Sequence, residues 1–227
     1  MGHALEINQN YNPVGEGMLH ALINDLAQRI LTLNKWEQCG QLRRFLAQFV
    51  LPEGGRVLDF GCGTALFATL FGQLGMDYHG YDIDSGLIRY AKRLYPQATF
   101  SASKEDLRKR GLFDLILINC STHHIPDDTL DNELNELEGL LKPSGMCILV
   151  DILKVHREEE TLLHNWFMKL EQGRYVRFAD VYLAFMSRSF TVTDQSQWRS
   201  HAFSLSSKLN PFYNDLVVIV GEKNITR

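Results

Sequence analysis

The stretch VLDFGCGTALFA, from Val57 to Ala68, decides the fold of this chain of 227 residues. Its first part, Val57 to Phe60, has the pattern of a short buried strand, and a helical pattern follows over Thr64 to Leu74. Glycines in the turn between them let the backbone approach a ligand closely, and the next helix offers its N-terminal amide groups. The stretch therefore predicts a strand, a ligand-binding turn and a helix.

Further along the chain, short apolar runs alternate with helical patterns. We expect strands over Met76–Asp82, Thr99–Ser101, Phe113–Asn119 and Met146–Ile152, and helices over Ser85–Leu94 and from Asp127 or Asp128 to Leu141. This alternation predicts a Rossmann-like, doubly wound α/β fold with a mostly parallel seven-stranded sheet. Beyond it we expect helices over Glu158–Gln172 and Phe178–Ser187, then an antiparallel strand pair over His201–Ser206 and Asp215–Gly221.

The chain before this core predicts two helices. Apolar residues recur at helical spacing from Met18 to Leu33 and again from Cys39 to Phe49, and Pro52 with the following glycines ends the second helix. We therefore expect an N-terminal helical cap over residues 1–52 and a core over residues 53–227. An insertion around residues 155–190 would cover the substrate.

The composition indicates the class of protein, its partners and the compartment in which it works. The apolar fraction of 45% is ordinary for a globular protein, no apolar run is long enough to span a membrane, and the N-terminus lacks a secretory pattern. A net charge of −4 argues against a nucleic-acid partner. The chain has four cysteines, Cys39, Cys62, Cys120 and Cys147, which lack the spacing of disulfide or zinc frameworks. This pattern favours a reducing compartment, the cytoplasm. We expect a monomer or a homodimer.

The glycine-rich turn departs from the dinucleotide-binding pattern GxGxxG. Leu66 stands where the third glycine of that pattern should fall, and Asp59 lies two residues before Gly61. An acid at this place repels a pyrophosphate but suits a ligand that carries an ammonium group.

This run resembles motif I of class I S-adenosylmethionine-dependent methyltransferases, with Ala65 where a third glycine is commonest. The resemblance covers roughly Arg56 to Asp151. It implies that Asp59 holds the methionine part of S-adenosylmethionine, and that Gly61, Cys62 and Gly63 line the cofactor.

The resemblance implies further cofactor contacts at the next strand ends. Asp82, 19 residues beyond Gly63, would bind the ribose hydroxyls, and Ile83 would pack on adenine. Asp84 is an alternative ribose ligand, or else the N-cap of the following helix. Ser103 stands where many members carry the aspartate that binds the adenine amine, with Glu105 or Asp106 as alternatives. Lys104 and Asn119 complete the expected cofactor set.

The segment after the fourth strand, from Asn119 to Pro126, is the candidate catalytic loop. It lacks the Asn/Asp-Pro-Pro-aromatic motif of methyltransferases that act on nitrogens of nucleic acids and proteins. His124 is the candidate general base, paired with Tyr11 as in phosphoethanolamine methyltransferases. Alternatively, one histidine of the loop packs and hydrogen-bonds to hold it.

Four further residues are candidates for substrate binding: His123, Asp151, His156 and Arg174. Asp151 has the alternative of a strand-end acid that meets backbone amides, and Arg177 could pair with a substrate anion beside Arg174. No two of these histidines and acids share the helical spacing of a metal site, so we expect no metal.

These observations predict a methyltransferase that transfers a methyl group from S-adenosylmethionine to a small molecule, with oxygen favoured over nitrogen or carbon as the acceptor. Three alternatives remain open. They are methylation of tRNA or protein, a non-catalytic regulatory subunit that binds the cofactor, and a nicotinamide-dependent dehydrogenase, which Leu66 disfavours.

Overall fold

The strand that leads into the glycine-rich turn lies inside a seven-stranded sheet. The computed structural model describes residues 37–154, 173–201 and 213–224. The strands are β1 (Arg56–Phe60), β2 (Asp77–Tyr81), β3 (Thr99–Ser101), β4 (Phe113–Asn119), β5 (Leu141–Ile152), β6 (Phe190–His201) and β7 (Tyr213–Lys223). Their order is β3-β2-β1-β4-β5-β7-β6, and β1 to β5 run parallel, whereas β7 is antiparallel to both of its neighbours. The expected mostly parallel sheet with a C-terminal antiparallel pair is confirmed.

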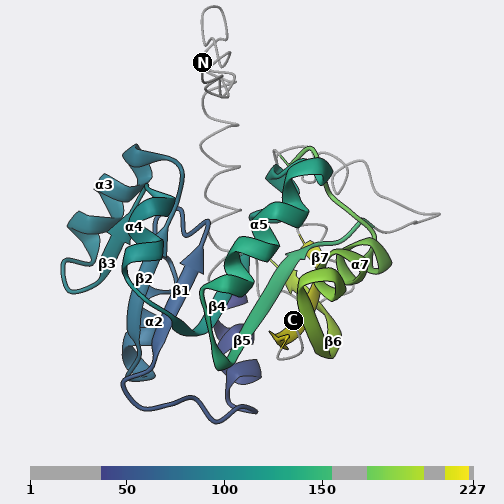
Figure 1. Ribbon diagram of the computed structural model, residues 1–227. Coiled ribbons are helices and arrows are strands. Elements are labelled where there is room, and N and C mark those ends of the chain that lie inside the picture. The colour runs from purple at the N-terminus through teal and green to yellow at the C-terminus, as the bar shows by residue number, and fades with distance from the viewer. Residues whose placement is uncertain (1–36, 155–172, 202–212, 225–227) are drawn as a thin grey trace, which may run out of the picture.

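Helices cover both faces of the sheet (Figure 1). One face carries a helix over residues 37–46, α2 (Ala68–Gln73) and α3 (Ser85–Leu94), and the other carries α4 (Lys104–Lys109), α5 (Asp127–Gly139) and α7 (Ala179–Ser189). Successive residues of a strand point to opposite faces. In β4, Leu115 and Leu117 therefore pack in the apolar core on the first face of the sheet, whereas Ile116 and Ile118 pack in the core on the second face. The apolar run of β4 thus reflects burial on both faces.

The expected strand over His201–Ser206 lies, beyond His201, outside the described residues, and the strand that precedes it was not predicted. The strand that pairs with β7 is β6, which ends at His201. Its sequence FTVTDQSQWRSH is mostly polar because β6 is an edge strand with a single neighbour. The short helix α4, which follows Ser103, was also not predicted as a separate element.

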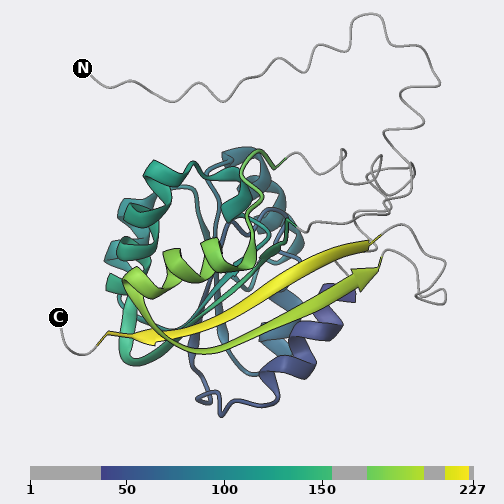
Figure 2. The ribbon, with the colours of Figure 1, turned by 90° about the vertical axis from the view of Figure 1, so that its right-hand side faces the viewer.

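The helix over residues 37–46 packs against the sheet and is the described part of the expected N-terminal cap. Phe45 lies edge-on to Trp198 of β6, with ring centroids 5.2 Å apart, and Gln41 Nε2 donates a hydrogen bond to the Arg199 carbonyl at 2.8 Å. Figure 2 shows this helix beside β6. The expected helices over Met18–Leu33 and Glu158–Gln172 lie outside the described residues, and the domain boundaries stay predictions. No helix within the described ranges is long and apolar enough to cross a membrane.

Candidate active site

The two glycines of the turn after β1 have left-handed backbone conformations. Gly61 has a φ of +76° and Gly63 a φ of +52°, which glycine adopts at little cost. A Cβ on Gly61 would lie 2.5 Å from Ser121 Cβ, whereas a Cβ on Gly63 would meet no described atom within 4 Å. Gly61 is therefore required by packing against the loop after β4. Gly63 faces open space that a ligand can approach.

Asp59 is a buried carboxylate at the end of β1. Its exposed fraction is 1%, and Tyr78 Oη donates a hydrogen bond to its Oδ2 at 2.5 Å. Burial raises the pKa of Asp59 to about 7; the Tyr78 hydrogen bond opposes this rise and the charge of Asp82 adds to it. A buried acid of this kind favours a cationic partner. Tyr78 was missed by the sequence reasoning because its contact with Asp59 joins two strands.

Asp82 lies beside the glycine turn. Its Oδ2 accepts a hydrogen bond from the Gly63 amide at 2.8 Å, and its Oδ1 accepts one from the Asp84 amide at 2.9 Å. Asp84 is the N-cap of α3, which is one of the two roles expected for it. Ile83 is 69% exposed, so an apolar side chain lies open beside Asp82.

The polar residues expected near adenine have partners in the protein. Ser103 is the N-cap of α4, and Lys104 Nζ forms ion pairs with Glu133 and Glu136 of α5. Asp106 Oδ2 accepts a hydrogen bond from the Ser101 hydroxyl at 2.9 Å. These contacts hold α4 between β3 and α5. Contacts of Ser103 and Lys104 with a cofactor stay predictions.

Asn119 links the end of β4 to the N-terminal helix. Its Nδ2 donates a hydrogen bond to Gln38 Oε1 at 3.3 Å, and Gln38 is only 3% exposed. Cys120 follows with a φ of +47°. Gln38 was missed by the sequence reasoning, because the contact joins residues 81 positions apart.

His123 and Asp151 form a buried pair beneath the loop after β4. Asp151 Oδ1 lies 2.5 Å from His123 Nδ1, and both residues are 0% exposed. The Asp151 carboxylate also accepts hydrogen bonds from the amides of Thr122, His123 and Ile152. Burial works to raise the pKa of Asp151, but the charge and hydrogen bond of His123 together with the other donors lower it below its ordinary value. This geometry favours the loop-holding alternative, and direct substrate binding by the pair stays a prediction.

His124 is the exposed histidine of the loop. It belongs to the 3₁₀ turn η1 (Thr122–His124), and its ring centroid lies 4.2 Å from that of His123. The candidate base His124 therefore lies against the buried ring of His123 at the carboxyl end of β4. Tyr11 and His156, its expected partner and an expected substrate ligand, lie outside the described residues.

Residues 173–177 fasten the same loop from the other side. Arg177 is 5% exposed, and its guanidinium donates hydrogen bonds to the carbonyls of Thr122 and Ile125 and to the Asp127 carboxylate. A Cβ on Gly173 would lie 2.2 Å from a ring atom of His123. Arg177 therefore binds protein groups, which corrects its expected pairing with a substrate anion. Arg174 is exposed, and its role in substrate binding stays a prediction.

Two further expectations concern metal and disulfides. Within residues 37–154, 173–201 and 213–224, no three His, Cys, Asp or Glu side chains gather closely enough to hold a metal ion. All four cysteines lie in the described part of the chain, and none forms a disulfide.

Comparisons with known proteins agree with this geometry. A family model described as a methyltransferase domain matches residues 33–188. The chain is 34% identical over 124 residues to the ribosomal protein L11 methyltransferase of Ralstonia pickettii (51% of this chain, 38% of that protein) and 35% identical over 118 residues to the ubiquinone biosynthesis O-methyltransferase of Nitrobacter winogradskyi (50% and 41%). It spans 38% to 61% of the lengths of the first curated relatives that it matches. The crystal structure of magnesium protoporphyrin IX methyltransferase from Synechocystis with bound S-adenosylhomocysteine has the same fold, with a TM-score of 0.64, 16% identity and coverage of 86% of both chains.

Proposed function

Because the chain belongs to the methyltransferase domain family, we propose that it transfers a methyl group from S-adenosylmethionine to a small molecule. The observation that carries this proposal is the turn at Gly63. Open space lies beside Gly63, a buried acid without a cationic partner among the described residues stands before it at Asp59, and the Asp82 carboxylate is bonded to its amide.

The residues present fit this cofactor. The Asp59 carboxylate would hold the ammonium of the methionine part, and Gly63 leaves room for its backbone to approach. Asp82 would accept hydrogen bonds from the ribose hydroxyls, since a carboxylate has more acceptor sites than its two backbone partners use. The exposed Ile83 would cover adenine. When bound, S-adenosylmethionine supplies a methyl group activated by the positive charge on sulfur.

The loop after β4 would place and deprotonate the acceptor. We propose that His124 accepts the proton of the attacking hydroxyl, while the buried His123–Asp151 pair and Arg177 hold the loop in place. Tyr11 as a latch on the site, and His156 and Arg174 as substrate contacts, are proposed from the sequence alone.

A small molecule with an oxygen acceptor is the favoured substrate. Support comes from the net charge of −4, the absent Asn/Asp-Pro-Pro-aromatic motif and the similarity to a ubiquinone biosynthesis O-methyltransferase. The similarity to a ribosomal protein L11 methyltransferase supports a protein substrate as the second candidate. The four cysteines without disulfides support a reducing compartment such as the cytoplasm.

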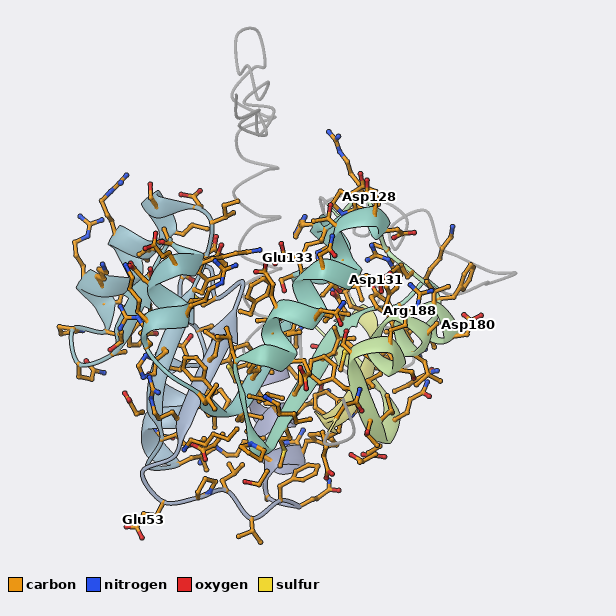
Figure 3. All side chains as sticks on the ribbon, viewed as in Figure 1. Glu53, Asp128, Asp131, Glu133, Asp180 and Arg188 are labelled. Atoms are coloured by element: carbon orange, nitrogen blue, oxygen red, sulfur yellow. The ribbon has the colours of Figure 1, made fainter. Side chains whose placement is uncertain are left out.

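Calorimetry with S-adenosylhomocysteine tests the cofactor proposal. We expect the wild type to bind, and Asp82→Asn to bind at least tenfold more weakly, since a lost hydrogen bond to a charged group costs about 1.5–3 kcal/mol. The control is Glu53→Gln, because Glu53 lies in the loop before β1, at the end of the molecule away from the start of α5 (Figure 3). Absence of binding by the wild type would overturn the proposal.

Methyl transfer from labelled S-adenosylmethionine tests the substrate class. The acceptors to compare are a panel of phenols and catechols, bulk tRNA and ribosomal protein. We expect label in the small molecules, with kcat lowered by His124→Gln. Label in ribosomal protein alone would support the second candidate instead.

A further inference from the structure

The hydrogen bond between Asp59 and Tyr78 lies beneath the proposed cofactor site. Asp59 is on β1 and Tyr78 on β2, and their exposed fractions are 1% and 3%. Tyr78 Oη donates to Asp59 Oδ2, and no other described residue donates a hydrogen bond to this carboxylate. The second oxygen, Oδ1, is therefore the one left for a ligand.

The phenol ring of Tyr78 is fixed by its neighbours. It packs against Phe71 of α2 and Phe100 of β3, with ring centroids 6.1 Å and 6.0 Å away. A ring packed against two aromatic neighbours keeps its hydroxyl aimed at one point, so little conformational freedom is lost when the hydroxyl orients the carboxylate.

The electrostatic surroundings of the pair contain acids and thiols. The charge of Asp82, after β2, raises the pKa of Asp59. The charge of Asp59 in turn raises the pKa of two neighbouring thiols, Cys62 in the turn and Cys39 in the helix over residues 37–46. Among the described residues Asp59 forms no ion pair with a basic side chain, and the nearby Arg43 acts on Cys39. A buried carboxylate without a cation is costly, so a cationic ligand gains most from reaching it.

We infer that Tyr78 is a positioning residue for cofactor binding: its hydroxyl holds Asp59 Oδ2 and thereby turns the ionised Oδ1 toward the ammonium of the cofactor. This inference rests on the proposed function. It assigns a role to a residue outside the glycine-rich turn, on the neighbouring strand.

Contact between Asp59 and the ammonium would couple cofactor binding to the loss of a proton. Burial raises the pKa of Asp59 to about 7, so near neutral pH part of the free protein carries a protonated Asp59. When an ammonium binds, the carboxyl O–H bond breaks, its proton passes to solvent, and the carboxylate pairs with the ammonium. Affinity should therefore rise with pH up to about 7 and then level off. Loss of the Tyr78 hydrogen bond, which favours the ionised form, should move this rise to higher pH.

The test is calorimetry of the full chain with S-adenosylhomocysteine between pH 6 and pH 8, in buffers of different ionisation enthalpy. We expect the wild type to release protons on binding, Asp59→Asn to release none, and Tyr78→Phe to bind at least tenfold more weakly at pH 7 with its rise in affinity shifted to higher pH. The control is Ser189→Ala. Ser189 is a buried residue of α7 on the opposite face, and its hydroxyl donates a hydrogen bond to Asn135 Oδ1 of α5 at 2.9 Å. This variant should lose stability without a change in affinity.

The outcomes separate the two proposals. If the wild type does not bind S-adenosylhomocysteine at any pH, the proposed function fails. If the wild type binds and Tyr78→Phe shows the same affinity and pH profile, only the inference fails. Carboxyl ¹³C NMR of wild-type Asp59 covers the case in which Tyr78→Phe does not fold. The pKa of Asp59 should fall on addition of S-adenosylhomocysteine, and an unchanged pKa would overturn the inference.

Discussion

Gly61 and Gly63 share a left-handed backbone conformation, but a side chain would meet different surroundings at the two positions. At Gly61 it would collide with Ser121, and at Gly63 it would enter open space. The first glycine therefore serves the packing of two loops, and the second serves the approach of a ligand.

Alanine substitutions should separate these roles. Gly61→Ala should lower the free energy of unfolding by about 2–4 kcal/mol, because the collision adds to the backbone strain. Gly63→Ala should cost only about 1 kcal/mol but should weaken S-adenosylhomocysteine binding at least tenfold, since the methyl group fills the open space. Urea unfolding and calorimetry measure the two effects.

The control for both variants is Gly72→Ala in α2. A Cβ there meets no atom within 4 Å outside the helix's own nearby backbone, so the change should be neutral or stabilise by up to about 1 kcal/mol. Unchanged cofactor affinity of Gly63→Ala would contradict the assignment of that open space to the ligand.

At the level of residues, the sequence predicted the contacts that local spacing determines. The glycine turn and the next strand end, which carry Asp59, Gly61, Gly63 and Asp82, could be located because they lie close together in the sequence, and the cofactor contacts of these residues stay predictions. The protein partners of Tyr78, Gln38 and Arg177 escaped prediction, because each contact is made across strands or over tens of residues. Such contacts depend on the register of strands and the path of loops, which residue spacing does not encode.

Residues 173–177 act as one element that holds the loop after β4. The Tyr175 amide donates to the His123 carbonyl at 2.9 Å, and the Arg177 amide and carbonyl also have partners, Tyr182 Oη and the Lys154 amide. The proposed base His124 thus lies in a loop that is fixed from beneath by Asp151 and from the side by Arg177.

The variant Arg177→Gln tests this element. Loss of the buried guanidinium leaves the Thr122 and Ile125 carbonyls without their charged donor, which should lower the free energy of unfolding by about 2–4 kcal/mol and increase amide exchange of residues 121–126. Arg188→Gln is the control. Arg188 forms an exposed ion pair with Asp131 between α7 and α5 (Figure 3), which should contribute less than about 1 kcal/mol. Equal effects of the two changes would contradict the role of Arg177 in holding the loop after β4.

Among the elements, the sequence predicted best those that are buried on both faces. The strands β1, β4 and β5 have apolar runs because helices cover both sides of the sheet there. The edge strand β6 lacks such a run, so it was not predicted. The short α4 was not recognised because it buries a single side chain, Leu107.

Over the whole molecule, two buried acids give stability opposite dependences on pH. The folded-state pKa of Asp59 is raised from 3.8 to about 7, so the folded state binds more protons than the unfolded state between these values, and stability falls as pH rises through that window. The pKa of Asp151 is lowered, so its contribution is present above its ordinary pKa and is lost as pH falls below it.

The variant Asp59→Asn should remove the first of these dependences. We expect the cofactor-free wild type to lose up to roughly 4 kcal/mol of unfolding free energy between pH 4 and pH 7, whereas Asp59→Asn should lose much less. Urea unfolding of both proteins at pH 4 and pH 7 measures the difference. A parallel pH dependence of the two proteins would show that Asp59 does not carry this effect.

The place of β7 in the sheet has a consequence for synthesis of the chain. β7 follows β6 in the sequence but lies between β5 and β6 in the sheet. The outer edge of β5 and the strand β6 therefore both lack β7 as a partner until residues up to about 223 have left the ribosome. A growing chain therefore holds an open edge at β5 and an unpaired polar strand until β7 has been made. A stop codon shortly before Tyr213 would leave both in that condition, and we expect such a product to aggregate or be degraded.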